Sequence, residues 1–270
     1  MEKKFQDQLK NLPKELQPYK CEIEATKKRY IPFTLKEAEN ISLTTSKVGG
    51  FPYLPLDAEY PTGKNDRKLN FLAQINFQEM PPLEGYPTHG ILQFYVDYML
   101  DYEYSLDNNA KVIYYEKIEK GYQDKFSTLE EIRDDMDYVS PFLKDSEFNI
   151  IFGSPEYESI TNMDIRFNDI LNFSNIDDDE EKDILIDTYE ETFWREKQHK
   201  VGGYPNFTQD DPHDYDEYDS KNDYRELLFQ LDSDDNNIMW GDSGIGNYFI
   251  RETDLKKRDF SRVLFNWDCY

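Results

Sequence analysis

Residues 46–55 read SKVGGFPYLP, and residues 199–208 read HKVGGYPNFT. Each stretch spells Lys-Val-Gly-Gly, an aromatic residue and proline, and the two copies lie 153 positions apart. Adjacent glycines permit a positive φ or a close backbone approach, while proline fixes its own φ and keeps the preceding aromatic residue out of the helical region. We therefore interpret six residues as structural turns: Gly49, Gly50, Pro52, Gly202, Gly203 and Pro205.

Two further features repeat at nearly the same spacing. Gln74 in LAQIN (72–76) precedes Gln230 in LFQLD (228–232) by 156 positions, and Gly90 precedes Gly246 by 156. Self-similarity at a fixed period is typical of repeated architectures. The sequence thus predicts one domain over 1–270, built from two related halves at about 40–100 and 195–265, with a helical and strand insertion between them.

Hydrophobic periodicity predicts the elements around these turns. Strand-like runs occur at 20–26, 69–77, 91–100, 111–118, 147–153 and in the stretch that follows Gly246. Helical spacing predicts a short helix at 5–12, and a capping box at Ser127 predicts another that ends near 139. We expect an α+β fold with mainly antiparallel sheets, a few peripheral helices and an internal pseudo-twofold duplication, in which sheets from the two halves pack together.

A third helix is predicted at 178–197, where acidic residues crowd the first turn and complement the helix dipole. Its apolar side would hold the following residues: Ile184, Ile186, Tyr189, Phe193 and Trp194.

The charge is unevenly distributed along the chain. There are 31 Lys and Arg against 56 Asp and Glu, a net charge of −25. Residues 1–47 carry +3, so the rest carries −28. Such a field disfavours binding to nucleic acid and to anionic membranes, and it attracts a basic partner protein. Residues 210–223 read as an exposed acidic loop, in which we assign five residues to partner binding: Asp214, Tyr215, Asp216, Glu217 and Tyr218.

Two cysteines, Cys21 and Cys269, are too few for a disulfide framework, and a reducing compartment is the natural interpretation. The N-terminal stretch lacks the apolar run of a secretory signal, and no stretch approaches the length of a membrane span. We expect a cytoplasmic protein.

Sites for chemistry are few. Asp232, Asp234 and Asn236 alternate as in the first half of a calcium loop, but the second half lacks the required glycine and glutamate, which favours a tight turn. His213 lies between carboxylates, as a general base or metal neighbour could, although an exposed loop histidine explains the pattern more simply. Asp242 could cap a turn as a buried carboxylate. We expect no metal and no cofactor.

The boxes KVGGFPYLP and KVGGYPN, the LAQIN and LFQLD segments and the stretch MWGDSGIGNYFI (239–250) together resemble the YwqG-like family, a bacterial domain family of unknown function. The resemblance covers residues 40–100 and 195–265, and 101–195 departs most from it. It implies a single α+β domain with many antiparallel strands and an internal duplication, and it carries over no catalytic residue. Some relatives look like neighbours of toxin genes, which implies an immunity role.

Two functions from different classes are compatible with these patterns. The first is a non-enzymatic acidic binding protein that captures a basic partner, in the manner of an immunity protein. The second is an enzyme or small-ligand-binding protein with its site at the seam between the halves, since clefts form at such seams. The ligand-binding residues of that seam would be Gln74, Gln230, Trp240 and Asp242.

Overall fold

The helices and strands are taken from a computed structural model of the chain. It describes residues 2–39, 41–63, 66, 68–97, 110–123, 141–143, 147–194, 198–214, 223–234 and 236–270. Among these, the helices and short 3-10 turns are α1 (Glu2–Lys10), η1 (Gln17–Tyr19), α2 (Lys20–Ala25), α4 (Phe167–Ile170), η3 (Phe173–Asn175), α5 (Asp179–Phe193), η4 (Pro212–Asp214) and α6 (Glu252–Lys257). The strands are β1 (Lys28–Ala38), β2 (Lys47–Val48), β3 (Asn70–Asn76), β4 (Ile91–Val96), β5 (Ala110–Tyr115), β6 (Glu147–Phe152), β7 (Glu156–Glu158), β8 (His199–Gly202), β9 (Glu226–Asp232), β10 (Ile245–Ile250) and β11 (Leu264–Asp268).

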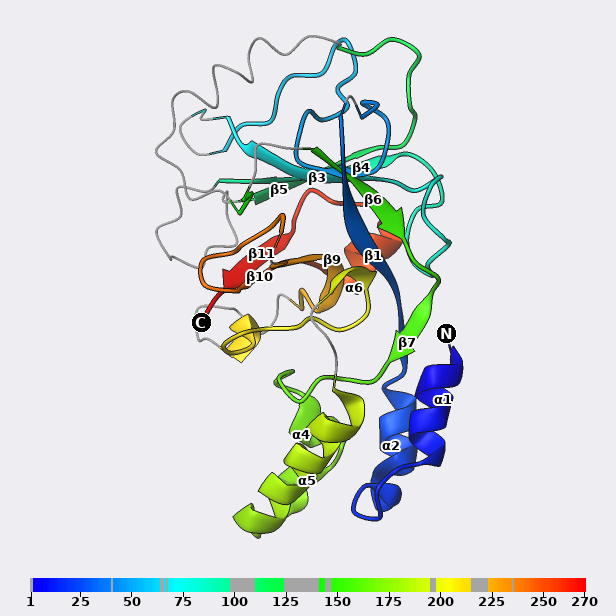
Figure 1. Cartoon of the computed structure of the whole chain (residues 1–270), viewed down its shortest axis with the longest axis vertical. Helices are drawn as coiled ribbons and strands as arrows, with labels where there is room; N and C mark the ends of the chain where they lie inside the picture. The colour runs from blue at the N-terminus through cyan, green and yellow to red at the C-terminus, as the bar shows by residue number, and fades with distance from the viewer. Residues whose placement is uncertain are drawn as a thin grey trace.

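All the strands belong to one antiparallel sheet. Its order is β11-β10-β9-β8-β1-β6-β2-β3-β4-β5. In addition, β7 pairs with the N-terminal end of β1, at residues 28–30. Figure 1 shows β3, β4 and β5 on one side of the body and β9, β10 and β11 on the other, with β1 and β6 crossing between them. The sheet is a nearly closed barrel.

The expected α+β class is therefore wrong. The two halves were expected to contribute separate sheets that pack together, but β1 and β6 join β8 to β2 edge to edge, so the strands form a single sheet. The physical reason is that β1 and β6 lie outside both proposed halves. Their pairing depends on contacts between residues far apart in the chain, which local periodicity does not report.

The main core fills the space that the sheet encloses. The ring of Phe94 on β4 stacks on that of Phe229 on β9, with centroids 4.4 Å apart. The hydroxyl of Tyr248 on β10 donates to the main-chain carbonyl of Tyr95 on β4 at 3.1 Å. Strands β3, β4, β9 and β10 are buried at nearly every position because smaller apolar clusters also cover their outer faces.

A second apolar core belongs to the helices. It joins α1 and α2 to α4, η3 and α5, which Figure 1 shows gathered at one end of the molecule, away from most of the sheet. Phe5 and Leu9 of α1 pack into this core, and the Phe5 and Phe193 rings lie 6.4 Å apart. No helix in the described part of the chain combines the length and apolar character that crossing a membrane requires.

Most element predictions are confirmed with small shifts of boundary. The runs at 69–77, 91–100, 111–118 and 147–153 correspond to β3, β4, β5 and β6, and the helices at 5–12 and 178–197 correspond to α1 and α5. The strand predicted at 20–26 is wrong, because residues 20–25 form α2, in which Ile23 is the one buried residue. The helix at 127–139 lies outside the described residues.

The predicted apolar side of α5 is partly wrong. Tyr189 and Phe193 are buried as expected, but Ile184 is 51% exposed and Trp194 is 61% exposed. Leu185 takes the buried position instead, because Leu185, Tyr189 and Phe193 recur every fourth residue and so lie on one face of the helix.

Candidate functional site

The second Gly-Gly box holds a buried ion pair. Lys200 Nζ lies 3.2 Å from both carboxylate oxygens of Glu158 on β7, and the ammonium also sits 5.4 Å from the ring of Tyr30. The same carboxylate accepts the main-chain N–H of Tyr204. Gly203 has φ +78°, and a Cβ there would collide with Glu158. The lysine and the second glycine of the box thus enclose one carboxylate, an arrangement that we call the second clamp.

The first box repeats the arrangement with looser contacts, and we call it the first clamp. Lys47 is fully buried, and its Nζ lies 3.8 Å from Glu147 Oε2 on β6. A Cβ on Gly50, whose φ is +67°, would collide with Glu147. Neither Lys47 Nζ nor Glu147 Oε2 makes a hydrogen bond within the described ranges. Burial lowers the pKa of Lys47 to about 8, although Glu147 opposes the shift.

The two glutamines brace their boxes through the main chain. Gln74 Oε1 accepts the N–H of Tyr53, and its Nε2 donates to two carbonyls of 43–45. Gln230 does the same at the second box, where Oε1 accepts the N–H of Asn206 and Nε2 donates to the carbonyl of Gln198. Binding of a ligand by Gln74 and Gln230 stays a prediction, and these bonds do not favour it because the amide groups already serve the fold.

The strand register revises one of the sequence matches. Gln93 lies opposite Gln74 and Asn247 lies opposite Gln230, which aligns β4 with β10 at an offset of 154. Gly90 therefore corresponds to Gly244, the residue that precedes β10, instead of Gly246. Gly246 has a different role, because a Cβ there would lie 2.6 Å from the Trp240 ring.

The two boxes do not meet at a seam. Val48 pairs with Phe148, which lies opposite Glu37 of β1, whereas Val201 pairs with Ile31 of the same strand. Six positions of a strand span about 20 Å. Strands β1 and β6 also lie between the boxes. The predicted seam residues consequently do not converge on one cleft.

Trp240 and Asp242 differ in burial. Trp240 is 3% exposed and packs against Phe265 and Trp267 in the main core, with ring centroids 6.0 Å away in each case. Asp242 is exposed, so its expected role as a buried cap is wrong. Residues 241–243 form a turn that leads into β10, and a turn at the surface needs no buried carboxylate.

The candidate calcium loop is a tight turn. Asp234 Oδ1 accepts the main-chain N–H groups of Asn236 and Asn237 at 2.8 and 2.5 Å. His199 Nδ1 accepts the N–H of Asp232 at 3.0 Å, which leaves Nε2 as the protonated nitrogen, 3.5 Å from Asp234 Oδ2. Burial raises the pKa of Asp234, but hydrogen bonds led by that from His199 outweigh it and hold the pKa well below its usual range. Within the described ranges, no three His, Cys, Asp or Glu side chains gather as a metal site requires.

His213 is more constrained than an exposed loop histidine, so that simpler interpretation is wrong. Its Nδ1 lies 2.6 Å from Asp211 Oδ1, its Nε2 lies 2.9 Å from the carbonyl of Tyr224, and its ring meets Phe249 edge-on. A carbonyl only accepts hydrogen bonds, so Nε2 carries a proton and Nδ1 faces a carboxylate. The side chain ties the start of the acidic loop to the segment just before β9 and to β10.

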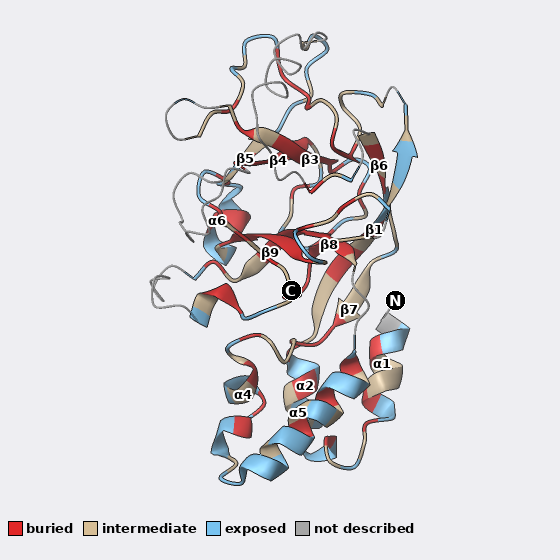
Figure 2. Ribbon diagram, turned by 60° about the vertical axis from the view of Figure 1, so that its left-hand side comes forward, coloured by how far each residue is buried: buried red, intermediate tan, exposed pale blue. Residues whose placement is uncertain are grey.

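The outward side of α5, together with the two residues before it, is strongly acidic. All nine carboxylates of residues 177–191 are exposed, and Lys182 is the one basic residue among them. Figure 2 shows the exposed face running along the helix. Ile184 and Trp194 add exposed apolar area near its middle and at its end. Of the predicted partner-binding residues, Asp214 is exposed, whereas Tyr215, Asp216, Glu217 and Tyr218 lie outside the described residues.

A family model for a domain of unknown function, DUF1963, matches residues 46–269. The chain belongs to this family. The matched region contains both boxes, both clamp carboxylates and α5, but it begins after β1. No curated protein matches this DUF1963 chain.

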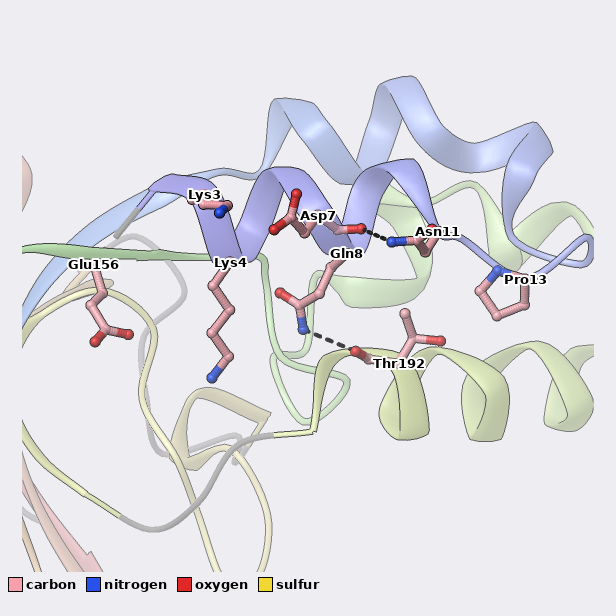
Figure 3. Close-up of a pocket in the computed structure, with 8 residues that line it drawn as sticks. All are labelled: Lys3, Lys4, Asp7, Gln8, Asn11, Pro13, Glu156 and Thr192. Carbon is pink, nitrogen blue, oxygen red and sulfur yellow. Dashed lines mark hydrogen bonds between the residues drawn. The ribbon is translucent and has the colours of Figure 1, made fainter.

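The DUF1963 chain also has an open groove that the sequence did not suggest. It occupies about 790 Å³ between α1, β7 and the C-terminal end of α5. In Figure 3, Gln8 extends from α1 toward α5, and its Nε2 donates to the carbonyl of Thr192 at 3.0 Å, while Lys4 points past the end of α5. Glu156 contributes a carboxylate that accepts the Tyr30 hydroxyl at 2.9 Å. These are ordinary surface residues from distant segments, so no local motif marks the groove.

Proposed function

We propose that this DUF1963 protein is a non-enzymatic binding protein whose acidic face captures a basic partner protein. The outward side of α5 is the observation that carries the proposal. Together with the two residues before the helix, it presents nine exposed carboxylates, and Ile184 and Trp194 supply exposed apolar side chains beside them. Aromatic side chains contribute much of the energy of protein interfaces, and carboxylates steer a basic partner toward them.

Helix α5 carries more negative charge than the stabilisation of its own dipole explains. Acidic residues near the N-terminus stabilise a helix through its dipole, so Asp178 to Glu181 have a structural explanation. Asp187, Glu190 and Glu191 lie toward the C-terminal end, where the dipole disfavours negative charge. Helix stability therefore does not explain these three exposed carboxylates, and binding of a basic partner does.

The finer parts of the proposal rest on sequence patterns. The resemblance to the YwqG-like family supports an immunity-like role, in which the basic partner is a toxin domain, and a cytoplasmic location suits such a role.

We also propose that the chain is a single domain of two related halves, at about 40–100 and 195–265. The matching clamps and the matching Gln74 and Gln230 bonds support this division.

The deciding experiment neutralises the α5 face without disturbing its cap. The test variant carries four substitutions: Asp183→Asn, Asp187→Asn, Glu190→Gln and Glu191→Gln. The matched control neutralises four exposed carboxylates elsewhere: Glu24→Gln, Asp57→Asn, Glu59→Gln and Glu84→Gln. Each set raises the net charge from −25 by four, to −21. The two variants therefore differ only in where the charge is removed.

Immobilised wild-type protein and both variants are compared in pull-downs from lysate at low and high salt. We expect the α5 variant to lose the bound partner and the control to retain it, and the bound fraction to fall at high salt because exposed charge is screened. Equal loss in both variants would show that net charge, not this face, attracts the partner. A bound fraction that ignores salt would refute electrostatic capture.

A further inference from the structure

The two clamps differ in how firmly their lysines are held. Lys200 contacts both oxygens of Glu158 at 3.2 Å and lies over the ring of Tyr30, and each contact stabilises the charged ammonium. Lys47 has a single carboxylate oxygen at 3.8 Å, beyond hydrogen-bond distance. Glu158 is 5% exposed, whereas the Glu147 side chain is 24% exposed. The second carboxylate is enclosed, and the first has a route toward solvent.

Few charged groups face Lys47. On β6 its neighbours are Glu147 and the uncharged Asn149, and on β3 its strand partner is the uncharged Gln74. Glu79 lies just before the start of β2, where it accepts the main-chain N–H of Ser46 at 2.7 Å. Glu147 is therefore the one counter-charge that the described neighbours offer to Lys47.

We propose that the first clamp is a proton-controlled latch, which opens when Lys47 loses its proton, while the second clamp stays closed. The ammonium of Lys47 is what holds the half-buried Glu147 side chain over Gly50, with its Oε2 atom out of contact with solvent. Once the amine is neutral, a buried unpaired carboxylate is unfavourable, and Glu147 turns toward solvent. Its departure uncovers Gly50 and loosens the turn that carries Phe51, Pro52 and Tyr53.

The pH range follows from the environment of the amine. Burial lowers the pKa of Lys47 to about 8, so its neutral fraction rises about tenfold between pH 7 and pH 9.5. An exposed lysine, with its ordinary value of 10.5, would stay charged over most of that range. The latch would thus respond under mildly alkaline conditions that leave other lysines protonated.

The test compares the two boxes within one molecule. Solvent-exchange rates of backbone amides are measured by NMR at pH 7 and pH 9.5 and corrected for intrinsic pH dependence. We expect protection at Gly50 and Phe51 to fall about tenfold, in step with the neutral fraction. Protection at the equivalent Gly203 and Tyr204 should stay constant. An unchanged first box, or equal changes in both boxes, would overturn the latch.

A variant adds a second criterion. Lys47→Met removes the titrating amine, so the exchange of Gly50 should lose its pH dependence. If the variant retains the dependence, another group controls the turn and the proposal fails. Should Lys47→Met not fold, the comparison of Gly50 with Gly203 in the wild-type protein still decides the question.

Discussion

Lys200 Nζ lies 3.2 Å from each carboxylate oxygen of Glu158, and both side chains are buried. Breaking such a pair leaves an uncompensated buried charge, which costs about 3–5 kcal/mol. We expect Glu158→Gln to lower the free energy of unfolding by that amount, measured by urea denaturation at pH 7. The double variant Glu158→Gln with Lys200→Met should recover much of the loss, because no isolated charge remains. Simple addition of the two single losses would contradict this explanation.

Gly203 should tolerate alanine less well than another glycine with the same backbone conformation. Both Gly203 and Gly85 have a positive φ, of +78° and +83°, but a Cβ on Gly85 would lie 3.9 Å from its nearest neighbour, a Leu255 methyl carbon. Gly85→Ala should cost only the backbone term of about 1–2 kcal/mol. Gly203→Ala adds overpacking against Glu158 of about 1–3 kcal/mol. The loss of stability in each variant is measured by thermal unfolding. Equal losses in the two variants would show that Glu158 moves away and relieves the collision with the new Cβ at position 203.

Replacing His213 should invert the pH dependence that Asp211 gives to the stability of the fold. Burial alone would raise the pKa of Asp211, but its hydrogen bonds with His213 outweigh burial and lower the pKa below 3.8. The stabilisation from Asp211 is therefore present above pH 3.8 and is lost as the pH falls through the lower folded value. In His213→Leu, burial would dominate and raise the pKa of Asp211 above its unfolded value, so the variant should be destabilised most near pH 7 and its deficit relative to the wild type should shrink as the pH falls. Unfolding free energies between pH 7 and pH 3 test this.

Asp211→Asn provides the control for that comparison. It removes the titrating carboxylate, so the narrowing of the His213→Leu deficit at low pH should disappear in the double variant. If the narrowing persists there, a different carboxylate depends on His213.

Asp178 should contribute more to the stability of α5 than its acidic neighbour Asp177. Asp178 Oδ1 accepts the main-chain N–H of Glu181 at 3.0 Å and so caps the helix. Asp178→Ala should lower the free energy of unfolding by about 1 kcal/mol. Asp177→Ala removes the same charge one residue earlier without removing the cap, and a change within about 0.5 kcal/mol is expected. Equal effects in chemical denaturation would indicate that charge, not the hydrogen bond, is responsible.

The features that the sequence predicted well are local ones. Strands β3 and β4 and helix α5 follow from patterns contained in a few consecutive residues. Strand β1 was missed because Pro32 stands in its middle, and proline normally argues against a central strand. The segment 20–26 was misassigned because the apolar residues Cys21, Ile23 and Ala25 alternate over too few positions to distinguish a strand from a short helix.

The clamps illustrate the limit of sequence reasoning about sites. The glycines of the two boxes were identified, but the carboxylates that require them were not. Glu147 and Glu158 are two of 56 acidic residues, and only the pairing of distant strands selects them. One signal was available, because both boxes begin with lysine. A lysine followed by Val-Gly-Gly in a buried strand needs a counter-charge.

The position of β1 bears on how the molecule can be divided. The DUF1963 match begins at residue 46, yet β1 ends at Ala38 and lies between β6 and β8 in the sheet. A fragment that spans only 46–269 would lose the strand on which β6, β7 and β8 all pair. Exposed strand edges recruit other chains. Expression of the matched region alone should therefore yield aggregates or strand-exchanged assemblies, and adding back residues 28–38 as a separate peptide should restore the size that the full chain has in solution.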